Sequence, residues 1–189
     1  MIADIYIFIR AFIRHKILHI DDRSQLEIAI SNGLKMGKDC HVMGECIIDP
    51  GHCWLISIGD RVTLAPRVHI LAHDASTKRE LGYTRLGCVS IGNDVFIGAG
   101  SIVLPGVCIG NKVVIGAGSV VSCSIPDNSI AVGNPARVVG TYDAFIERRT
   151  QEKNEYPCFD FTFTIGNITK EKRDEMLRLI QEYGRGYVV

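Results

Sequence analysis

Aliphatic residues recur at every sixth position through the middle of the chain. The recurrence is unbroken at six successive sites, which are Ile91, Ile97, Val103, Ile109, Ile115 and Val121. It continues upstream as Ile58, Leu64 and Ile70, and more faintly as Met36, Val42 and Ile48. A period of six fits neither the 3.6-residue turn of a helix nor the alternation of an ordinary strand. The pattern therefore predicts a repeat protein in which each unit is one short strand followed by a turn.

Three such units make a coil of 18 residues, so residues 18 positions apart should stack on each other in neighbouring coils. Ile91 is expected to stack on Ile109, and likewise Ile97 on Ile115 and Val103 on Val121, at the spacing of parallel strands. Glycines follow four of these aliphatic residues and mark turns where an unusual backbone conformation is often needed. A narrow triangular interior would exclude rings, and between positions 13 and 140 the chain has only three aromatic residues.

Composition divides the chain into three segments. We expect residues 1–33 to form an N-terminal helical cap segment, residues 34–136 the repeats with an inserted loop at 71–88, and residues 137–189 a charged C-terminal extension. Residues 2–20 have the pattern of an amphipathic helix, which would pack over the open end of the repeats, onto a neighbouring subunit, or on a membrane surface. In the extension, residues 159–165 alternate like an edge strand, and Thr169 and Gly184 bracket a helix.

The residue before each inward aliphatic position should point away from the core, because side chains alternate along a strand. In the later coils these residues are all apolar: Phe96, Ile102, Cys108, Val114 and Val120. We interpret them as one outward stripe that self-association buries. Coverage of the stripe by the flanking segments of a monomer is the alternative.

Charge and cysteine content narrow the class of protein. The 21 basic and 21 acidic residues cancel, which argues against a nucleic-acid partner. The seven cysteines form no C-x-x-C pair, which is typical of a reducing compartment and predicts a cytoplasmic protein. The longest apolar stretch, residues 2–9, is too short to span a membrane.

The repeats end in a Gly-Asn-Pro-Ala-Arg stretch at 133–137 and are interrupted by a polar loop that begins near His73. Over residues 34–140 these features resemble the hexapeptide-repeat acyltransferases, and within them the sugar and polysaccharide O-acetyltransferases related to galactoside and maltose acetyltransferase. The resemblance implies an all-β solenoid, a left-handed parallel β-helix with short helical N- and C-terminal segments. It also implies a homotrimer with active sites between subunits, and transfer of an acetyl group from acetyl-CoA to a hydroxyl of a sugar or glycan precursor, free or lipid-linked.

The resemblance assigns His73 as the general base. An imidazole suits that role because its ordinary pKa near 6.5 lets it accept a hydroxyl proton at neutral pH. His52 and His69 are weaker candidates for contact with the acceptor. Galactoside-type relatives bind the acceptor through an asparagine, which aligns with Met43 or Glu45 here, so the acceptor sugar stays open. No metal is expected.

For acetyl-CoA, the resemblance points to small residues along a groove between neighbouring subunits and to one cation. The residues it implies are Ala99, Ala117, Ser122, Cys123 and Arg137, of which Arg137 would bind a phosphate of the cofactor.

Three other functions are known or conceivable for a protein with such repeats. A non-catalytic scaffold or assembly subunit has the same repeats but would show no thioester turnover. Serine O-acetyltransferase relatives carry a long helical N-terminal domain, whereas about 33 residues precede the repeats here. A carbonic-anhydrase-like metal enzyme needs three converging histidines, and only His69 and His73 have suitable spacing.

Overall fold

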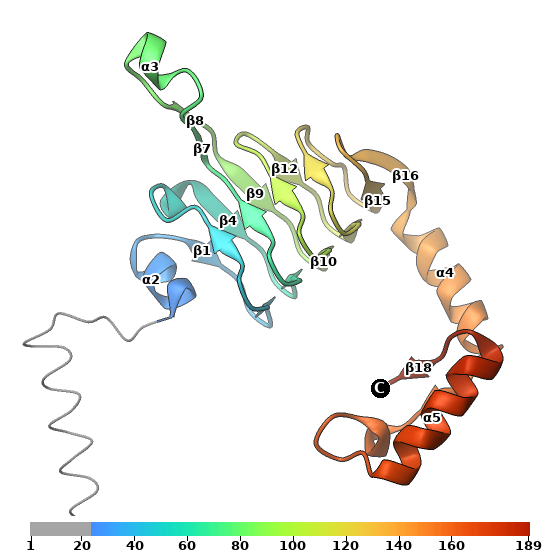
Figure 1. Cartoon of the computed structure of the whole chain (residues 1–189). Helices are drawn as coiled ribbons and strands as arrows, with labels where there is room; N and C mark the ends of the chain where they lie inside the picture. Colours follow the sequence, from blue (N-terminus) through green and yellow to red (C-terminus); the bar gives the residue numbers. More distant parts are fainter. Residues whose placement is uncertain (1–23) are drawn as a thin grey trace, which may run out of the picture.

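The computed structural model describes residues 24–189, so the helix expected at residues 2–20 lies outside the described residues. From Lys35 onward the chain visits three sheets in turn, and each circuit is one coil of a three-sided parallel β-helix (Figure 1). Sheet A contains β1 (Lys35–Met36), β4 (Ile56–Ile58), β9 (Val89–Ile91) and β12 (Cys108–Ile109). Sheet B contains β2 (His41–Val42), β5 (Thr63–Leu64), β10 (Val95–Ile97), β13 (Val113–Ile115), β15 (Ser129–Val132) and β16 (Arg137–Thr141). Sheet C contains β3 (Ile47–Ile48), β6 (His69–Ile70), β11 (Ile102–Val103) and β14 (Val120–Val121).

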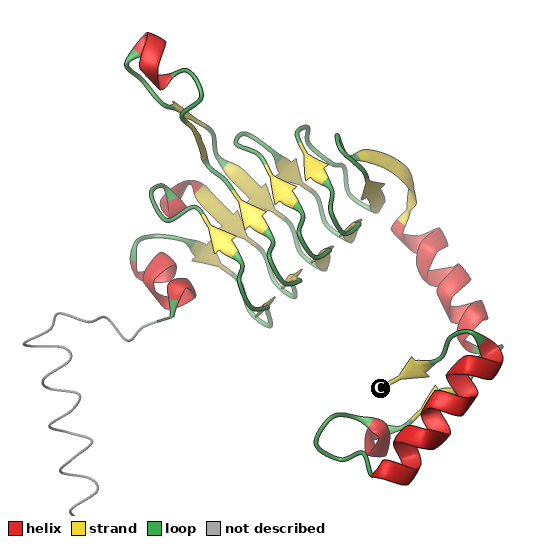
Figure 2. Cartoon of the chain, in the orientation of Figure 1, coloured by secondary structure: helices red, strands yellow, loops and turns green. Residues whose placement is uncertain are grey.

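The stacking predicted from the repeat is confirmed. Ile91 pairs with Ile109, Ile97 with Ile115 and Val103 with Val121, each in parallel register. These side chains are buried, together with the other inward aliphatic residues of the successive coils. The fainter repeat at the start of the pattern is confirmed as well, because its residues pair in register with the next coil: Met36, Val42 and Ile48. Figure 2 shows how short the strands are and how much of each coil is turn.

Polar side chains tie the coils together at the corner between sheets A and B. The amide of Lys38 donates to the carboxylate of Asp60, 2.7 Å away, and the amide of Asp60 donates to the side-chain oxygen of Asn93 at 2.8 Å. The same contact repeats from Asn93 to Asn111 at 2.8 Å and from Asn111 to Asp127 at 2.7 Å. This corner ladder satisfies turn amides that the sheets leave unpaired.

Gly98 lies where two coils touch through their backbones. A Cβ atom at this position would be 2.4 Å from the amide nitrogen of Ala117. We expect Gly98→Ala to lower the free energy of unfolding by about 1–3 kcal/mol, because backbone atoms cannot move aside without separating the coils. Gly140→Ala is the control, since nothing lies within 4 Å of its added Cβ. Urea denaturation of the two variants at one protein concentration tests this, and equal stabilities would contradict it.

The outward apolar residues do not form one stripe, so the single stripe predicted from the sequence is wrong. Phe96 and Val114 lie on sheet B, Ile102 and Val120 on sheet C, and Cys108 on sheet A. Consecutive hexads occupy different faces of a three-sided coil, so residues six apart cannot share a face. A single flat interface therefore cannot bury all five.

The N-terminal end of the β-helix is covered in part by α2 (Gln25–Ser31). Its first turn has a capping box, in which Ser24 accepts from the amide of Glu27 and the Glu27 carboxylate accepts from the amide of Ser24. Ala29 is the buried residue of this helix, and its carbonyl accepts from the thiol of Cys53. Cys53 belongs to η2 (Cys53–Leu55), a short 3₁₀ turn that precedes β4.

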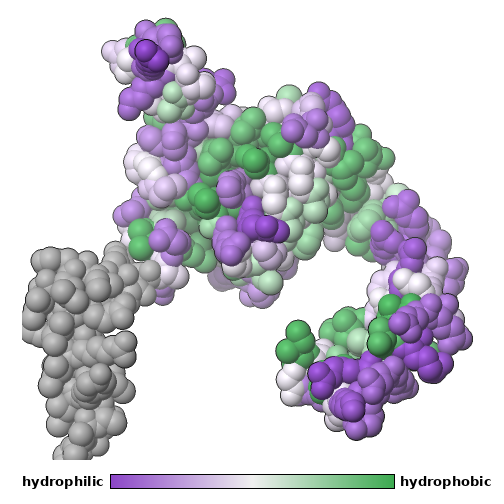
Figure 3. All heavy atoms as spheres, in the orientation of Figure 1, coloured by the Kyte–Doolittle hydropathy of each residue, from purple (hydrophilic) through white to green (hydrophobic). Residues whose placement is uncertain are grey.

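The C-terminal extension begins inside sheet B. β16 pairs antiparallel with β15, so the sheet continues past the boundary that the sequence placed at 136/137. α4 (Tyr142–Lys153) follows and leads away from the β-helix, with its N-terminus capped by Thr141 (Figure 1). On the side drawn in Figure 3, the surface of the helices beyond β16 is largely hydrophilic. Among residues 24–189 no helix combines the length and apolarity needed to cross a membrane.

The end of the chain forms a small unit of its own. The prediction of an edge strand at residues 159–165 is wrong for most of that range. A short strand, β17 (Cys158–Phe159), pairs with β18 (Tyr187–Val188), and the 3₁₀ turn η3 (Phe161–Phe163) follows it. The carboxylate of Asp160 accepts from the amide of Thr162 and so favours a turn over an extended chain. The predicted helix is confirmed as α5 (Lys170–Tyr183), capped by Thr169 and ended by Gly184 in the left-handed conformation.

Candidate functional site

The inserted loop is a hairpin that stands out from the corner between sheets C and A. β7 (His73–Asp74) pairs antiparallel with β8 (Arg85–Leu86), and α3 (Lys78–Leu81) forms the tip. Figure 1 shows this hairpin projecting from the coils, with β7 and β8 at its base and α3 farthest away. The amide of Gly87 donates to the carbonyl of Ala72 at 3.0 Å and closes the base of the hairpin. His73 is therefore held at the root of the loop, next to the rigid coils.

His73 contacts a buried carboxylate. Its Nδ1 lies 2.6 Å from Oδ2 of Asp49, a hydrogen bond in which the imidazole N–H donates. The side chain of His73 is 36% exposed, whereas that of Asp49 is fully buried. With Nδ1 bound in this way, Nε2 carries the lone pair. The arrangement can accept a proton at Nε2 and stabilise the resulting imidazolium with a fixed negative charge.

Asp49 is held in place by the backbone on both sides. Its Oδ2 also accepts from the amide of Ala72 at 2.8 Å, and its Oδ1 accepts from the amides of Gly51 and His52, each at 3.1 Å. Burial raises the pKa of Asp49, but the hydrogen bonds from Ala72, His73 and Gly51 outweigh it and hold the pKa below its ordinary value. The carboxylate is thus ionised at neutral pH and cannot rotate.

The coil register explains why these two residues meet. Ile48 pairs with Ile70 in sheet C, and the amide of Asp49 donates to the carbonyl of Ile70 at 2.9 Å. Asp49 therefore follows β3 at the same corner where the loop follows β6. Asp49 is not among the site residues predicted from the sequence. Its position in the sequence could have indicated the contact, because Asp49 directly follows the inward Ile48, one coil before the loop that carries His73.

His52 joins the same cluster. Its ring centroid lies 5.1 Å from that of His73 and 5.3 Å from that of Trp54. Its Nδ1 is 3.9 Å from Oδ1 of Asp49, is buried, and has no hydrogen-bond partner among the described residues. Of the weaker histidine candidates, His52 is the one that the structure brings beside His73.

Asp49, His52 and His73 are also the one group of potential metal ligands among residues 24–189 whose donor atoms lie within 4.8 Å of one another. The two oxygens of Asp49 already accept four N–H groups, which occupy the usual acceptor directions of a carboxylate. The donor chemistry therefore favours a hydrogen-bonded cluster over a metal centre.

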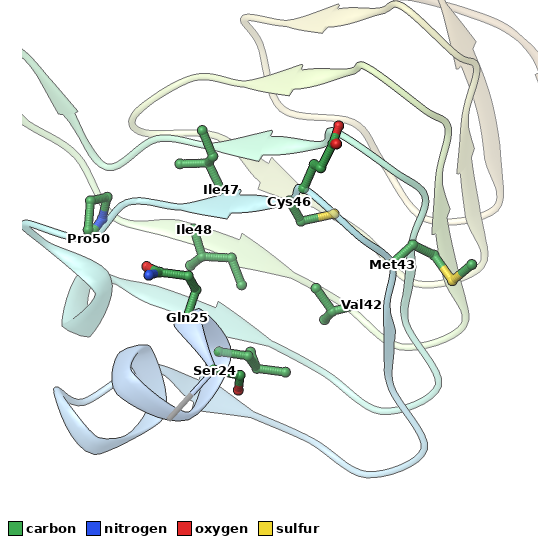
Figure 4. Close-up of a pocket in the computed structure, with 10 residues that line it drawn as sticks. Ser24, Gln25, Val42, Met43, Cys46, Ile47, Ile48 and Pro50 are labelled. Carbon is green, nitrogen blue, oxygen red and sulfur yellow. The ribbon is translucent and has the colours of Figure 1, made fainter. Parts of the chain in front are cut away.

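The other two candidates for the acceptor lie elsewhere on the coils. His69 points outward from β6, between Ile47 and Ile102 in the register of sheet C. Glu45 lies in the turn before β3, with a φ of 63°, and lines a cavity of about 600 Å³ between the first coil and the start of α2. Figure 4 shows side chains of β2, β3 and the first residues of α2 around this cavity, which reaches Pro50, the residue after Asp49.

The residues expected to bind the cofactor divide between two corners that flank sheet C. Ala99 and Ala117 occupy equivalent positions of successive coils, because the amide after Ala117 donates to the carbonyl of Ala99 at 2.9 Å. Ser122 and Cys123 follow β14 and are exposed at the corner from which the loop also leaves. Arg137 is exposed at the start of β16, and its Nη1 donates to the carbonyl of Ala136 at 2.9 Å.

Comparison with known proteins identifies the family. Residues 88–123 match the family "Bacterial transferase hexapeptide (six repeats)". The chain is 41% identical over 129 residues to Protein CapG of Staphylococcus aureus, a match that covers 66% of this chain and 74% of CapG. It is 40% identical over 89 residues to galactoside O-acetyltransferase of Escherichia coli (strain K12), covering 46% of this chain and 44% of that protein.

A solved structure resembles the fold as well. It is a maltose O-acetyltransferase from Clostridium difficile 630, with 42% identity and a TM-score of 0.52 over 56% of this chain and 57% of that one. Apart from CapG, the chain spans about half the length of these relatives. The repeats, the coils and the match to most of CapG lead to one conclusion: the chain belongs to the bacterial hexapeptide-repeat transferases.

Proposed function

We propose that the protein is an O-acetyltransferase that moves the acetyl group of acetyl-CoA to a hydroxyl of a sugar or glycan precursor. The observation that carries the proposal is the hydrogen bond between His73 and the buried, ionised Asp49 at the root of the inserted loop. The names of the galactoside and maltose O-acetyltransferase relatives support the choice of an acetyl group and of a sugar hydroxyl as its acceptor.

In the proposed reaction, Nε2 of His73 takes the proton of the acceptor hydroxyl as its oxygen attacks the thioester carbonyl. Asp49 holds the ring through Nδ1 and stabilises the imidazolium that forms. The tetrahedral intermediate collapses with cleavage of the carbon–sulfur bond, and the imidazolium returns the proton to the leaving thiolate. The products are an acetyl ester and free CoA.

For acetyl-CoA, we place the pantetheine arm along sheet C, where the small side chains of Ala99 and Ala117 would let it approach the backbone. Ser122 and Cys123 lie at the other corner of that sheet, and the exposed guanidinium of Arg137 would bind a phosphate. For the acceptor, Glu45, His52 and His69 are the proposed contacts. We also propose that the coil is left-handed. The protein would act in polysaccharide biosynthesis and be located in the cytoplasm.

We further propose a homotrimer in which two chains share each active site. The outward side chains of sheet C support it, because Ile102 and Val120 lie next to each other on this face and Ile47, on the far side of His69, is 44% exposed. Light scattering at micromolar concentration is expected to give three times the 20.9 kDa of the chain. A monomer would contradict the shared site.

The activity is tested by mixing the full chain with acetyl-CoA and a thiol reagent in the presence of single acceptors. Glucose, galactose, maltose and N-acetylglucosamine represent the proposed class, and serine represents the amino-acid alternative. Thiol release that depends on a sugar supports the proposal. Release with serine alone would indicate a serine O-acetyltransferase, and no release with any acceptor would favour a scaffold subunit.

A further inference from the structure

One buried nitrogen beside the proposed base is left unused by the mechanism above. His52 faces Asp49 with Nδ1, which makes no hydrogen bond among residues 24–189, while 28% of the side chain is exposed. The backbone holds this residue firmly, because its amide donates to Oδ1 of the same carboxylate. Its ring is also flanked by the rings of His73 and Trp54. Both imidazoles thus turn Nδ1 toward one negative charge.

The charge of Asp49 selects the tautomer of His52. A lone pair on Nδ1 at 3.9 Å from Oδ1 would face an anionic oxygen, whereas an N–H at the same place is attracted to it. Neutral His52 therefore carries its proton on Nδ1 and its lone pair on Nε2. His73 has the same arrangement because of its hydrogen bond to Oδ2. The cluster presents two imidazole acceptors side by side.

We propose that His52 binds the acceptor by accepting a hydrogen bond from the hydroxyl next to the one that His73 deprotonates, so that the site selects acceptors with two adjacent hydroxyls. The ring centroids are 5.1 Å apart, and hydroxyls on neighbouring carbons lie closer together than that. One hydroxyl of such a pair would donate a hydrogen bond to His73, and the other would donate one to His52. The inference rests on the proposed acetyl transfer and names the chemical feature of its acceptor.

The hydrogen bond from the acceptor hydroxyl to His52 would be equally strong in the bound ground state and in the transition state. It should therefore affect KM and not kcat. Its loss should raise KM for the acceptor about tenfold and leave kcat nearly unchanged. A residue that acts through His73 would instead lower kcat. The matched variants are His52→Gln, whose amide reaches about as far as Nε2, and His52→Asn, whose amide ends near Nδ1. We expect His52→Asn to lose the contact and His52→Gln to retain part of it.

The experiment measures kcat and KM for the best sugar of the acceptor panel and for its monodeoxy analogues that lack one hydroxyl next to the acetylated position. Parent protein should lose about tenfold in kcat/KM with one of these analogues. His52→Asn should lose about tenfold with the full sugar and nothing further with that analogue, because both changes remove the same contact. His41→Asn is the control, since His41 lies on sheet B and should behave as the parent does.

Three results would overturn the inference. A fall in kcat of His52→Asn with an unchanged acceptor KM would show that His52 positions His73. Equal losses of His52→Asn with the full sugar and with every deoxy analogue would show that no adjacent hydroxyl is bound. A parent protein that acetylates no sugar would contradict the proposed function itself, and this is seen before any variant is compared.

Discussion

Replacing His73 with alanine is expected to lower kcat for acetyl transfer by a factor on the order of 10²–10⁴, the usual contribution of a positioned general base. The loss should fall on kcat, because the proton moves only on the way to the transition state. Thiol release from acetyl-CoA at saturating acceptor measures it. Turnover above about a tenth of the parent rate would contradict the assignment.

His73→Asn separates chemistry from stability in this experiment. The side-chain amide ends near the position of Nδ1 and can still donate to Asp49, but it offers no basic nitrogen. It should therefore match the kinetic loss of His73→Ala while unfolding closer to the parent. His69→Ala serves as the second comparison and should be much milder, since His69 points outward from β6.

Replacing Asp49 with asparagine is expected to cost on the order of 10²–10⁴ in kcat as well, because a neutral amide neither fixes the tautomer of His73 nor stabilises its imidazolium. Asparagine keeps nearly the same volume in a fully buried position, so the coils should still form. The same assay measures the loss, with circular dichroism as the check on folding. A variant that retains more than a tenth of the parent rate would show that Asp49 serves the fold alone.

The depressed pKa of Asp49 adds a pH dependence to this variant. A carboxyl group whose pKa is lower in the folded state than its ordinary value of 3.8 stabilises the fold at pH values above that ordinary value. That contribution is lost as the pH falls through the folded value. The difference in the free energy of unfolding between the parent and Asp49→Asn should therefore be largest at pH 5–7 and become smaller below about pH 4. A gap that widens on acidification would contradict the direction of the shift.

Most of the coiled region was predictable because the six-residue repeat carries its own register. Once Ile91 is assigned to one coil, Ile109 must lie beside it, and the parallel pairing bears this out. The corner ladder was not predicted, although the recurrence of Asn or Asp after glycine at 92–93 and 110–111 held the signal. The prediction of one outward stripe is wrong because a linear repeat does not show which face of the coil each unit occupies. Six residues advance the chain by one face, and only 18 return it to the same face.

Asp49 was missed for a physical reason. The first coil spans 22 positions between Met36 and Ile58, and its extra residues include the turn at Pro50 and η2. A repeat pattern says nothing about where an irregular stretch folds. What decides the position of Asp49 is its stacking beside the loop of the following coil, a contact between residues 24 positions apart. Residues 159–165 illustrate the converse, because a local side-chain contact at Asp160 overrides a strand-like pattern.

The strand that leads into Asp49 is the terminal strand of its sheet. Within residues 24–189, β3 pairs with β6 alone and precedes every other strand of sheet C in the chain. In a stacked array each coil is stabilised by its nearest neighbours, and end units open at a lower cost than the whole molecule. Fraying of that first coil would withdraw the carboxylate from His73 while the remaining coils stay intact. The proposed catalytic pair thus depends on an end coil, and we expect inactivation by heat to precede global melting.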